Sequence, residues 1–291
     1  MFSSQLIIVT GKGGVGKSAL ASAIALRSAR SRPTVLVTLE TQGRIHPFLD
    51  VRLDYEPVSA APGLSVCQVA ALPAIREYVR RKVPFSGVYD AFLRSRMFRD
   101  FAEAAPGFEE LMCLGKVYDL ATSRDFEQVV FDAPSTGHFK TLMEVPAATL
   151  DAVRVGPLNH NARRIEDLLL DPERCSVVLA GLPEEMAVRE VLDLRTFCAE
   201  HRIAVGGVLI NQWVAERFLT EEIAQLKNVT GGSPALTGAL AAAIAEAELA
   251  ASQRSALGLL GESVRHLKIP RFIDQTPQAL IEHIGGVLDA G

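Results

Sequence analysis

The sequence predicts an α/β fold: a doubly wound, mainly parallel sheet with a helical insertion. Short continuous runs of Val, Ile and Leu recur along the chain and alternate with stretches of helical spacing. Such runs are typical of parallel strands that are buried on both faces. The 291 residues, 48% of them hydrophobic, are enough to bury a large core, and we expect residues 1–291 to form one domain.

The amino-terminal part contains three predicted strands. Residues 5–10 (QLIIVT) are an apolar run that ends at a group of glycines, and residues 17–31 after it have helical spacing. Residues 34–40 (TVLVTLE) and 64–70 (LSVCQVA) are two further apolar runs. The chain is therefore expected to open with a strand, a glycine-rich loop and a helix.

The alternation stops between residues 71 and 125. Residues 75–101 and 108–123 have helical spacing, and no strand-like run lies between them. We therefore expect residues 71–125 to form a helical subdomain that is inserted into the sheet domain.

Four more strands are predicted in the second half of the chain. They are residues 128–132, 175–181, 205–211 and 264–270, each an apolar run rich in Val, Ile or Leu. A second helix-rich stretch covers about 215–260 and contains the Ala-rich ALTGALAAAIAEAELAA. The predicted sheet thus has seven strands.

Composition excludes several classes of protein. The net charge of −4 gives no basic surface for nucleic acid, and no apolar run approaches the length of a membrane span. The start has no basic region before its apolar run, so no signal peptide is expected. The four cysteines are far apart without a CxxC pair. We expect a cytoplasmic protein with reduced, buried thiols, no structural zinc and no membrane anchor.

Residues 11–18 (GKGGVGKS) fit the phosphate-loop pattern GxxxxGK[ST] and lie between a predicted strand and a predicted helix. Lys17 is expected to reach the β and γ phosphates of a nucleotide, and the Ser18 hydroxyl to ligate Mg²⁺. The sheet is then of the P-loop NTPase type; the alternative is a glycine-rich turn without a ligand. The other residues of this loop and of the helix start that are expected to bind the nucleotide are Gly13, Gly14, Val15, Gly16 and Ala19.

A second lysine, Lys12, lies in the same loop. The pattern KGGxGK[ST] resembles the deviant Walker A loop of a class of ATPases that includes septum-positioning, plasmid-partition, arsenite-pump and tail-anchored-protein-targeting members. The resemblance implies that Lys12 crosses a dimer interface and stabilises charge on the partner's nucleotide, as an arginine finger does. The alternative is a solvated loop lysine.

Downstream segments narrow the resemblance. Residues 129–138 (VVFDAPSTGH) resemble the switch II segment of the arsenite-pump and tail-anchored-protein-targeting branch, which implies that Asp132 holds the Mg²⁺ shell and Gly137 senses the γ-phosphate. VLIN at 208–211 resembles the strand of that branch whose Asn, here Asn211, contacts adenine. Pro270 is expected to flank the adenine.

Switch I departs from the family's pattern. Where the family has TDPAHN, residues 39–44 read LETQGR, so the water-orienting Asp is replaced by Glu40. Glu40 keeps a carboxylate but carries one more methylene, which predicts slow hydrolysis of ATP.

The resemblance implies an Mg-ATP-binding, nucleotide-switched dimeric ATPase that acts as a chaperone or targeting factor. The alternative is a regulatory nucleotide-binding subunit that pairs with a more active paralogue. The partner is accordingly a second copy or a paralogue, and a protein client is expected at the helical subdomain. A small-molecule phosphotransferase or reductase with the same loop is disfavoured by the second lysine and by switch II.

Overall fold

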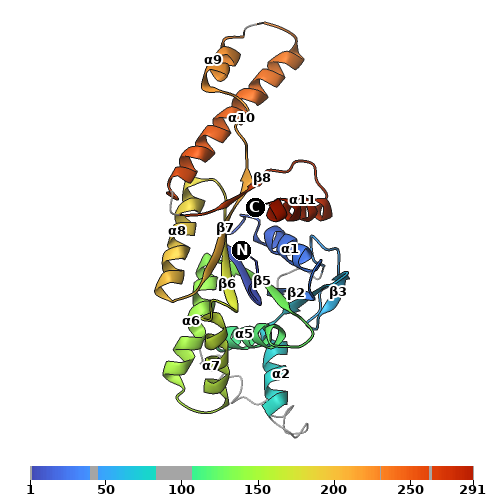
Figure 1. Cartoon of the computed structure of the whole chain (residues 1–291), viewed down its shortest axis with the longest axis vertical. Helices are drawn as coiled ribbons and strands as arrows, with labels where there is room; N and C mark the ends of the chain where they lie inside the picture. Colours follow the sequence, from blue (N-terminus) through green and yellow to red (C-terminus); the bar gives the residue numbers. More distant parts are fainter. Residues whose placement is uncertain (1, 40–44, 83–106, 230, 262–263, 291) are drawn as a thin grey trace.

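The central feature of the chain is one mainly parallel β-sheet (Figure 1). The structure is a computed structural model that describes residues 2–39, 45–82, 107–229, 231–261 and 264–290. The sheet order is β3-β4-β2-β5-β1-β6-β7-β8, with only the β3–β4 pair antiparallel among the described residues. The strands are β1 (Leu6–Gly11), β2 (Thr34–Leu39), β3 (Val58–Ala61), β4 (Leu64–Val69), β5 (Gln128–Ser135), β6 (Cys175–Gly181), β7 (Val205–Trp213) and β8 (Leu267–Pro270).

Helices cover both faces of this sheet, which confirms the doubly wound α/β class. Alternate residues of β1 belong to opposite cores: Leu6 and Ile8 pack with α5 to α8, whereas Ile7 and Val9 pack with α1 and α11. All four are buried. The helices are α1 (Lys17–Ser28), α2 (Ala71–Lys82), α5 (Phe108–Ala121), α6 (Thr136–Ala152), α7 (Pro157–Leu169), α8 (Glu185–Glu200), α9 (Thr220–Asn228), α10 (Pro234–Gly258) and α11 (Pro277–Ala290).

The seven predicted strands are all present, but the sheet has an eighth strand that the apolar runs did not predict. β3 is a four-residue edge strand with the sequence VSAA and a partly exposed surface. It is joined to β4 by Pro62 and Gly63, and Gly63 has a φ of 75°. A Pro-Gly pair is a turn signal that could have revealed this hairpin.

The predicted insertion at 71–125 begins and ends in helices. α2 and α5 pack against each other, and α5 also contacts the sheet. Residues 83–106 between them lie outside the described residues. The helical subdomain therefore stays a prediction, in which α2 and α5 are the parts that can be placed.

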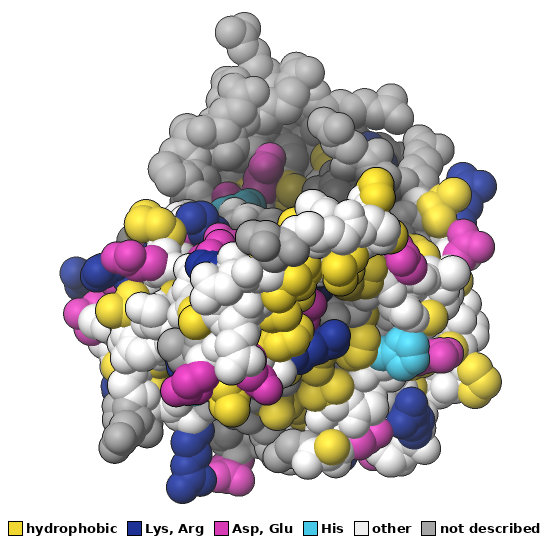
Figure 2. All heavy atoms as spheres, turned by 90° about the horizontal axis from the view of Figure 1, so that it is seen from above, with side chains coloured by type: hydrophobic (Ala, Val, Ile, Leu, Met, Phe, Trp, Pro, Cys, Tyr) yellow, Lys and Arg dark blue, Asp and Glu magenta, His cyan; other side chains and the backbone are white. Residues whose placement is uncertain are grey.

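The helices α9 and α10 form an arm that projects away from the sheet (Figure 1). Most of the first half of α10 is exposed, and by length and composition alone this helix is apolar enough to cross a membrane. Three ion pairs hold the arm together, such as Lys227–Glu248 at 2.7 Å. In the view from above, acidic and basic side chains are interspersed around a group of hydrophobic ones (Figure 2).

All four cysteines are buried free thiols, as the sequence predicts. Burial raises the pKa of Cys67 and of Cys175 to about 12 and that of Cys198 to about 11. These thiols therefore stay protonated at neutral pH and fill the core as small apolar groups.

Candidate functional site

The predicted phosphate loop lies at the carboxyl edge of the sheet, where β1 turns into α1. β1 ends at Gly11 and α1 begins at Lys17, so residues 12–16 form the connection. β5 lies directly beside β1, with Val9 opposite Asp132. Because parallel strands end at the same edge of a sheet, this register brings Asp132 close to the loop.

Gly16 allows the loop to meet the helix. It has a φ of 90°, in the left-handed region, and it precedes α1 without a side-chain cap. A Cβ atom built on Gly16 would lie 2.5 Å from Nδ2 of Asn211. Any larger residue would therefore be strained in its backbone and would collide with β7.

The start of α1 has the properties of an anion site. No acidic residue lies in its first turn, and the backbone N–H groups at a helix N-terminus attract negative charge. The Lys17 ammonium lies back over the loop and donates a hydrogen bond of 3.1 Å to the Lys12 carbonyl. Burial lowers the pKa of Lys17, while Asp132 and Glu190 act in the opposite direction.

Ser18 and Asp132 are paired as a metal site would require. Burial raises the pKa of Asp132, whereas a hydrogen bond with Ser18 and the charge of Lys17 favour its carboxylate form. Mg²⁺ is commonly held by one or two protein oxygen ligands, with phosphate and water as the others. One hydroxyl and one carboxylate in contact fit that requirement.

Two buried hydroxyl groups beside Asp132 have no hydrogen-bond partner in the part of the chain that the structure describes. They belong to Thr38, opposite Asp132 in the β2–β5 register, and to Thr136, at the start of α6. A buried hydroxyl without a partner is unusual, so both are free to bind a ligand or its water shell. Sequence reasoning missed both threonines, because the register between two strands is not visible in the sequence.

The end of β5 after Asp132 and the first turn of α6 both contact neighbouring elements. The Thr10 hydroxyl donates to the Pro134 carbonyl at 3.0 Å. Gly137 is exposed in the first turn of α6, and the neighbouring His138 lies 3.8 Å from Glu110 of α5. A displacement of residues 134–138 would therefore change the contact between His138 and Glu110 of α5.

Asn211 is buried at the end of β7 and contacts the loop itself. Its Nδ2 donates to the Val15 carbonyl at 2.9 Å, and its Oδ1 accepts from the backbone N–H of Gln212 at 3.0 Å. One amide hydrogen and one lone pair remain for another partner. The structure thus brings Asn211 to Val15 and Gly16.

Pro270 ends β8 and lies opposite Trp213 of β7. The two residues line a cavity of about 410 Å³ between the ends of these strands and α10. Lys268 lies 4.3 Å above the centre of the Trp213 ring. Trp213 was not singled out in the sequence, although it is the one tryptophan of the chain.

Lys12 is partly exposed, and its ammonium has no carboxylate partner among the described residues. Glu40, the predicted water-orienting residue, lies outside the described residues. The other predicted residues are arranged around the carboxyl edge of β1, β5 and β7. They are the residues of the phosphate loop, Asp132, Gly137 and Asn211.

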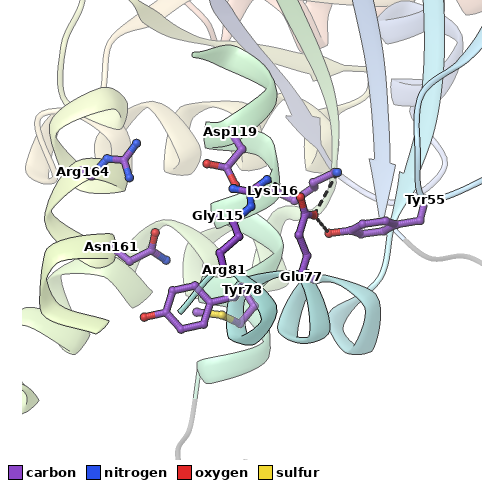
Figure 3. Close-up of a pocket in the computed structure, with 11 residues that line it drawn as sticks. Tyr55, Glu77, Tyr78, Arg81, Gly115, Lys116, Asp119, Asn161 and Arg164 are labelled. Atoms are coloured by element: carbon purple, nitrogen blue, oxygen red, sulfur yellow. Dashed lines mark hydrogen bonds and ion pairs between the residues drawn. The ribbon is translucent and has the colours of Figure 1, made fainter. Parts of the chain in front are cut away.

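A second cluster of charged residues lies away from this edge, between α2, α5 and α7 (Figure 3). The Lys116 ammonium is almost fully buried, 3.1 Å from Glu77 and 3.3 Å from Glu56. The Tyr55 hydroxyl donates to Glu77 at 2.6 Å. Burial opposes ionisation of Glu77, but the hydrogen bonds from Tyr55 and Lys116 prevail and lower its pKa.

This cluster surrounds a cavity of only about 80 Å³, far smaller than a nucleotide requires. Its charged groups also pair with one another, as in the Arg81–Asp119 contact at 2.5 Å. We therefore assign it a structural role and place the functional site at the loop.

Comparisons with known proteins find one matching family and relatives over much of the chain. The model of a family described as anion-transporting ATPase matches residues 4–156, which run from just before β1 to just after α6. The chain is 27% identical over 284 residues to ATPase BagA of Mycobacterium tuberculosis, covering 90% of this chain and 79% of that protein. It is 26% identical to an arsenical pump-driving ATPase of Acidiphilium multivorum over 230 residues, 70% of this chain and 39% of the relative. With an ATPase ASNA1 homolog of Cryptosporidium parvum it shares 26% identity over 240 residues, 71% of this chain and 64% of the relative.

Proposed function

This chain belongs to the anion-transporting ATPase family and is therefore an ATPase, and from that premise we propose that it is an Mg-ATP-binding, nucleotide-switched dimer. The observation that carries the proposal is the meeting of Lys17, Ser18 and Asp132 at the carboxyl edge of β1 and β5. A cation, a hydroxyl and a carboxylate at the N-terminus of a helix fit a magnesium–triphosphate group.

Each described residue has a role that fits its position, and the role of Glu40 rests on the resemblance of its segment. The backbone of residues 13–19 and the Lys17 ammonium bind the phosphates, and Ser18 and Asp132 hold Mg²⁺, which when bound neutralises charge on the phosphates. Asn211 and Pro270 lie on the side of β7 and β8, where the base would lie. Glu40 accepts a hydrogen bond from the attacking water, and Gly137 senses the γ-phosphate.

The proposed switch has a physical connection to the rest of the molecule. Gly137 and His138 lie in the first turn of α6, and His138 faces Glu110 at the start of α5. α5 in turn packs against α2, and both helices belong to the predicted client-binding subdomain at 71–125. A change of nucleotide at Asp132 and Gly137 would reach that subdomain through α5, as a chaperone or targeting factor requires.

Lys12→Ala tests the dimer. The variant should bind MgATP about as tightly as the wild-type chain, since Lys17 is retained, but it should lose ATP-dependent dimerisation or dimer-linked hydrolysis. Sedimentation with a non-hydrolysable ATP analogue measures the first effect and phosphate release the second. Wild-type dimerisation and turnover in Lys12→Ala would return this lysine to a solvated loop residue.

Glu40→Gln tests the origin of the predicted slow turnover. The amide keeps the size of the side chain but removes its charge, so single-turnover phosphate release should fall about tenfold or more while the affinity for MgATP changes by less than about twofold. The effect acts on the water and leaves the phosphates alone. Equal rates for the two proteins would mean that another group orients the water.

The function as a whole is tested by incubating the purified chain with MgATP, alone and with a paralogue of the family, while mass and phosphate release are measured together. Dimers and slow turnover of the chain alone support the homodimeric ATPase. Turnover that appears only with the paralogue supports the alternative, a regulatory subunit of a heterodimer. No binding of MgATP by the folded chain contradicts the proposal. The buried free thiols suit the cytoplasm, the compartment that we propose.

A further inference from the structure

Gln253, a polar side chain in the last third of α10, is buried where the arm formed by α9 and α10 meets the end of β7. Although most of α10 is exposed, its last third returns to the sheet and buries Ala250, Gln253, Ala256 and Leu257. Gln253 is only 6% exposed. A glutamine is rarely buried so deeply unless its amide is fully used.

Both ends of the Gln253 amide bind the backbone that follows Asn211. Its Oε1 accepts a hydrogen bond of 2.8 Å from the Val214 N–H, and its Nε2 donates one of 3.2 Å to the Gln212 carbonyl. An apolar side chain of the same size would leave both backbone groups without these partners.

The segment held in this way is strained. Gln212 has a φ of 59°, in the left-handed region, which a residue with a side chain adopts at a cost. The register between β7 and β8 also shifts between Ile210 and Trp213, so the sheet ladder alone does not fix this backbone. The two hydrogen bonds from Gln253 help to hold this backbone in place.

The same segment is connected to the phosphate loop through Asn211. The Gln212 N–H donates to Asn211 Oδ1, and Asn211 Nδ2 donates to the Val15 carbonyl. A continuous series of hydrogen bonds therefore leads from Val15, next to Gly16, to Gln253 on α10. The orientation of the Asn211 amide depends on the backbone that Gln253 holds.

We propose that Gln253 is a positioning residue for recognition of the nucleotide base. It fixes residues 211–214 so that the free hydrogen and lone pair of Asn211 face a purine edge, the chemistry by which an asparagine amide reads adenine. This inference rests on the proposed function, since it concerns the nucleotide that the loop binds. The phosphates are held by the backbone of residues 13–19 and by Lys17, and Asn211 contacts this loop at the Val15 carbonyl, so loss of Gln253 should weaken binding of the base more than binding of the phosphates.

The test compares a ligand that has a base with one that has none. Dissociation constants for MgATP and for magnesium tripolyphosphate are measured by calorimetry for the wild-type chain, Gln253→Leu and Gln253→Glu. Gln253→Leu removes both hydrogen bonds, so MgATP affinity should fall about tenfold and tripolyphosphate affinity less than about twofold. Gln253→Glu keeps the acceptor for Val214 but sets a carboxylate oxygen against the Gln212 carbonyl, so its MgATP affinity should fall at least as far.

Leu257→Ala is the matched control. Leu257 is buried on the same helix one turn after Gln253, but its side chain has no amide group to bind the Gln212 backbone. The variant should lower the melting temperature while the ratio of the two affinities stays at the wild-type value. If tripolyphosphate binds too weakly to titrate, the ratio of the affinities for ATP and GTP replaces it as the measure of base recognition. An unchanged ratio in both Gln253 variants, or an equal change in Leu257→Ala, overturns the inference. Absence of MgATP binding by the wild-type chain would instead contradict the proposed function.

Discussion

Replacing Lys17 with alanine is expected to lower the affinity for MgATP by about tenfold or more, on the order of 1.5–3 kcal/mol for a lost charge-assisted contact. The reason lies in the position of its ammonium, which is drawn over the loop toward the Lys12 carbonyl and close to Asp132. In that place it is the cation best able to meet the β and γ phosphates. Calorimetry with MgATP measures the loss.

The folded state should survive this change. Burial already lowers the pKa of Lys17, so the ammonium gains little from its environment while no nucleotide is bound, and the melting temperature of the chain without nucleotide should change little. Lys12→Ala is the matched control, because it removes the other lysine of the same loop. A folded Lys17→Ala protein that binds MgATP as tightly as the wild-type chain would contradict the nucleotide site.

Replacing Lys116 with methionine is expected to destabilise the chain by about 2 kcal/mol, because loss of one partner leaves a mostly buried carboxylate only partly compensated. The side chains of Lys116 and Glu77 are 6% and 16% exposed and lie 3.1 Å apart. Methionine fills most of the volume but leaves Glu77 with only Tyr55 and Arg81. Urea denaturation at pH 7 measures the loss.

The double variant Lys116→Met/Glu77→Gln separates charge from packing. It removes the uncompensated carboxylate but keeps an acceptor for the Tyr55 hydroxyl, so it should recover much of the lost stability. Equal stabilities of the single and the double variant would mean that packing, not charge, explains the role of Lys116.

The dependence on pH follows from the lowered pKa of Glu77. A carboxyl group whose pKa is lower in the folded state stabilises the fold above its unfolded value, about 4.5, and this contribution is lost as the pH falls through the folded value. The difference between the wild-type chain and Lys116→Met should therefore be largest at neutral pH and shrink below about pH 4.5. A difference that grows in acid would contradict this assignment.

Local patterns in the sequence were sufficient to predict most of the fold. β1, β5 and β6 are largely buried on both faces, and a strand of that kind is apolar at most positions, so its sequence stands out. β3 did not stand out, since an edge strand packs on one side and can be made of Ser and Ala. The turn signal at Pro62 and Gly63 was present but was not used.

The residues of the candidate site also differ in whether the sequence alone reveals them. The loop at 11–18 is a contiguous motif, because one phosphate group must be surrounded by the N–H groups of successive residues. Lys17 and Ser18 follow from that motif, and Asp132 was predicted from the apolar strand that it ends and from the resemblance of its segment. The sequence by itself therefore determined the fold class, and it predicted the phosphate loop and the kind of ligand that suits it.

Only the tertiary structure decided which distant residues complete the site. Thr38 lies opposite Asp132 through a strand register, Asn211 reaches Val15 across 196 positions of the chain, and Gln253 reaches Gln212 from the last third of α10. These contacts have no spacing rule, because they depend on how separate elements pack and not on the periodicity of any one of them. A buried glutamine looks like any other polar residue of a helix until the backbone groups that it satisfies are placed beside it.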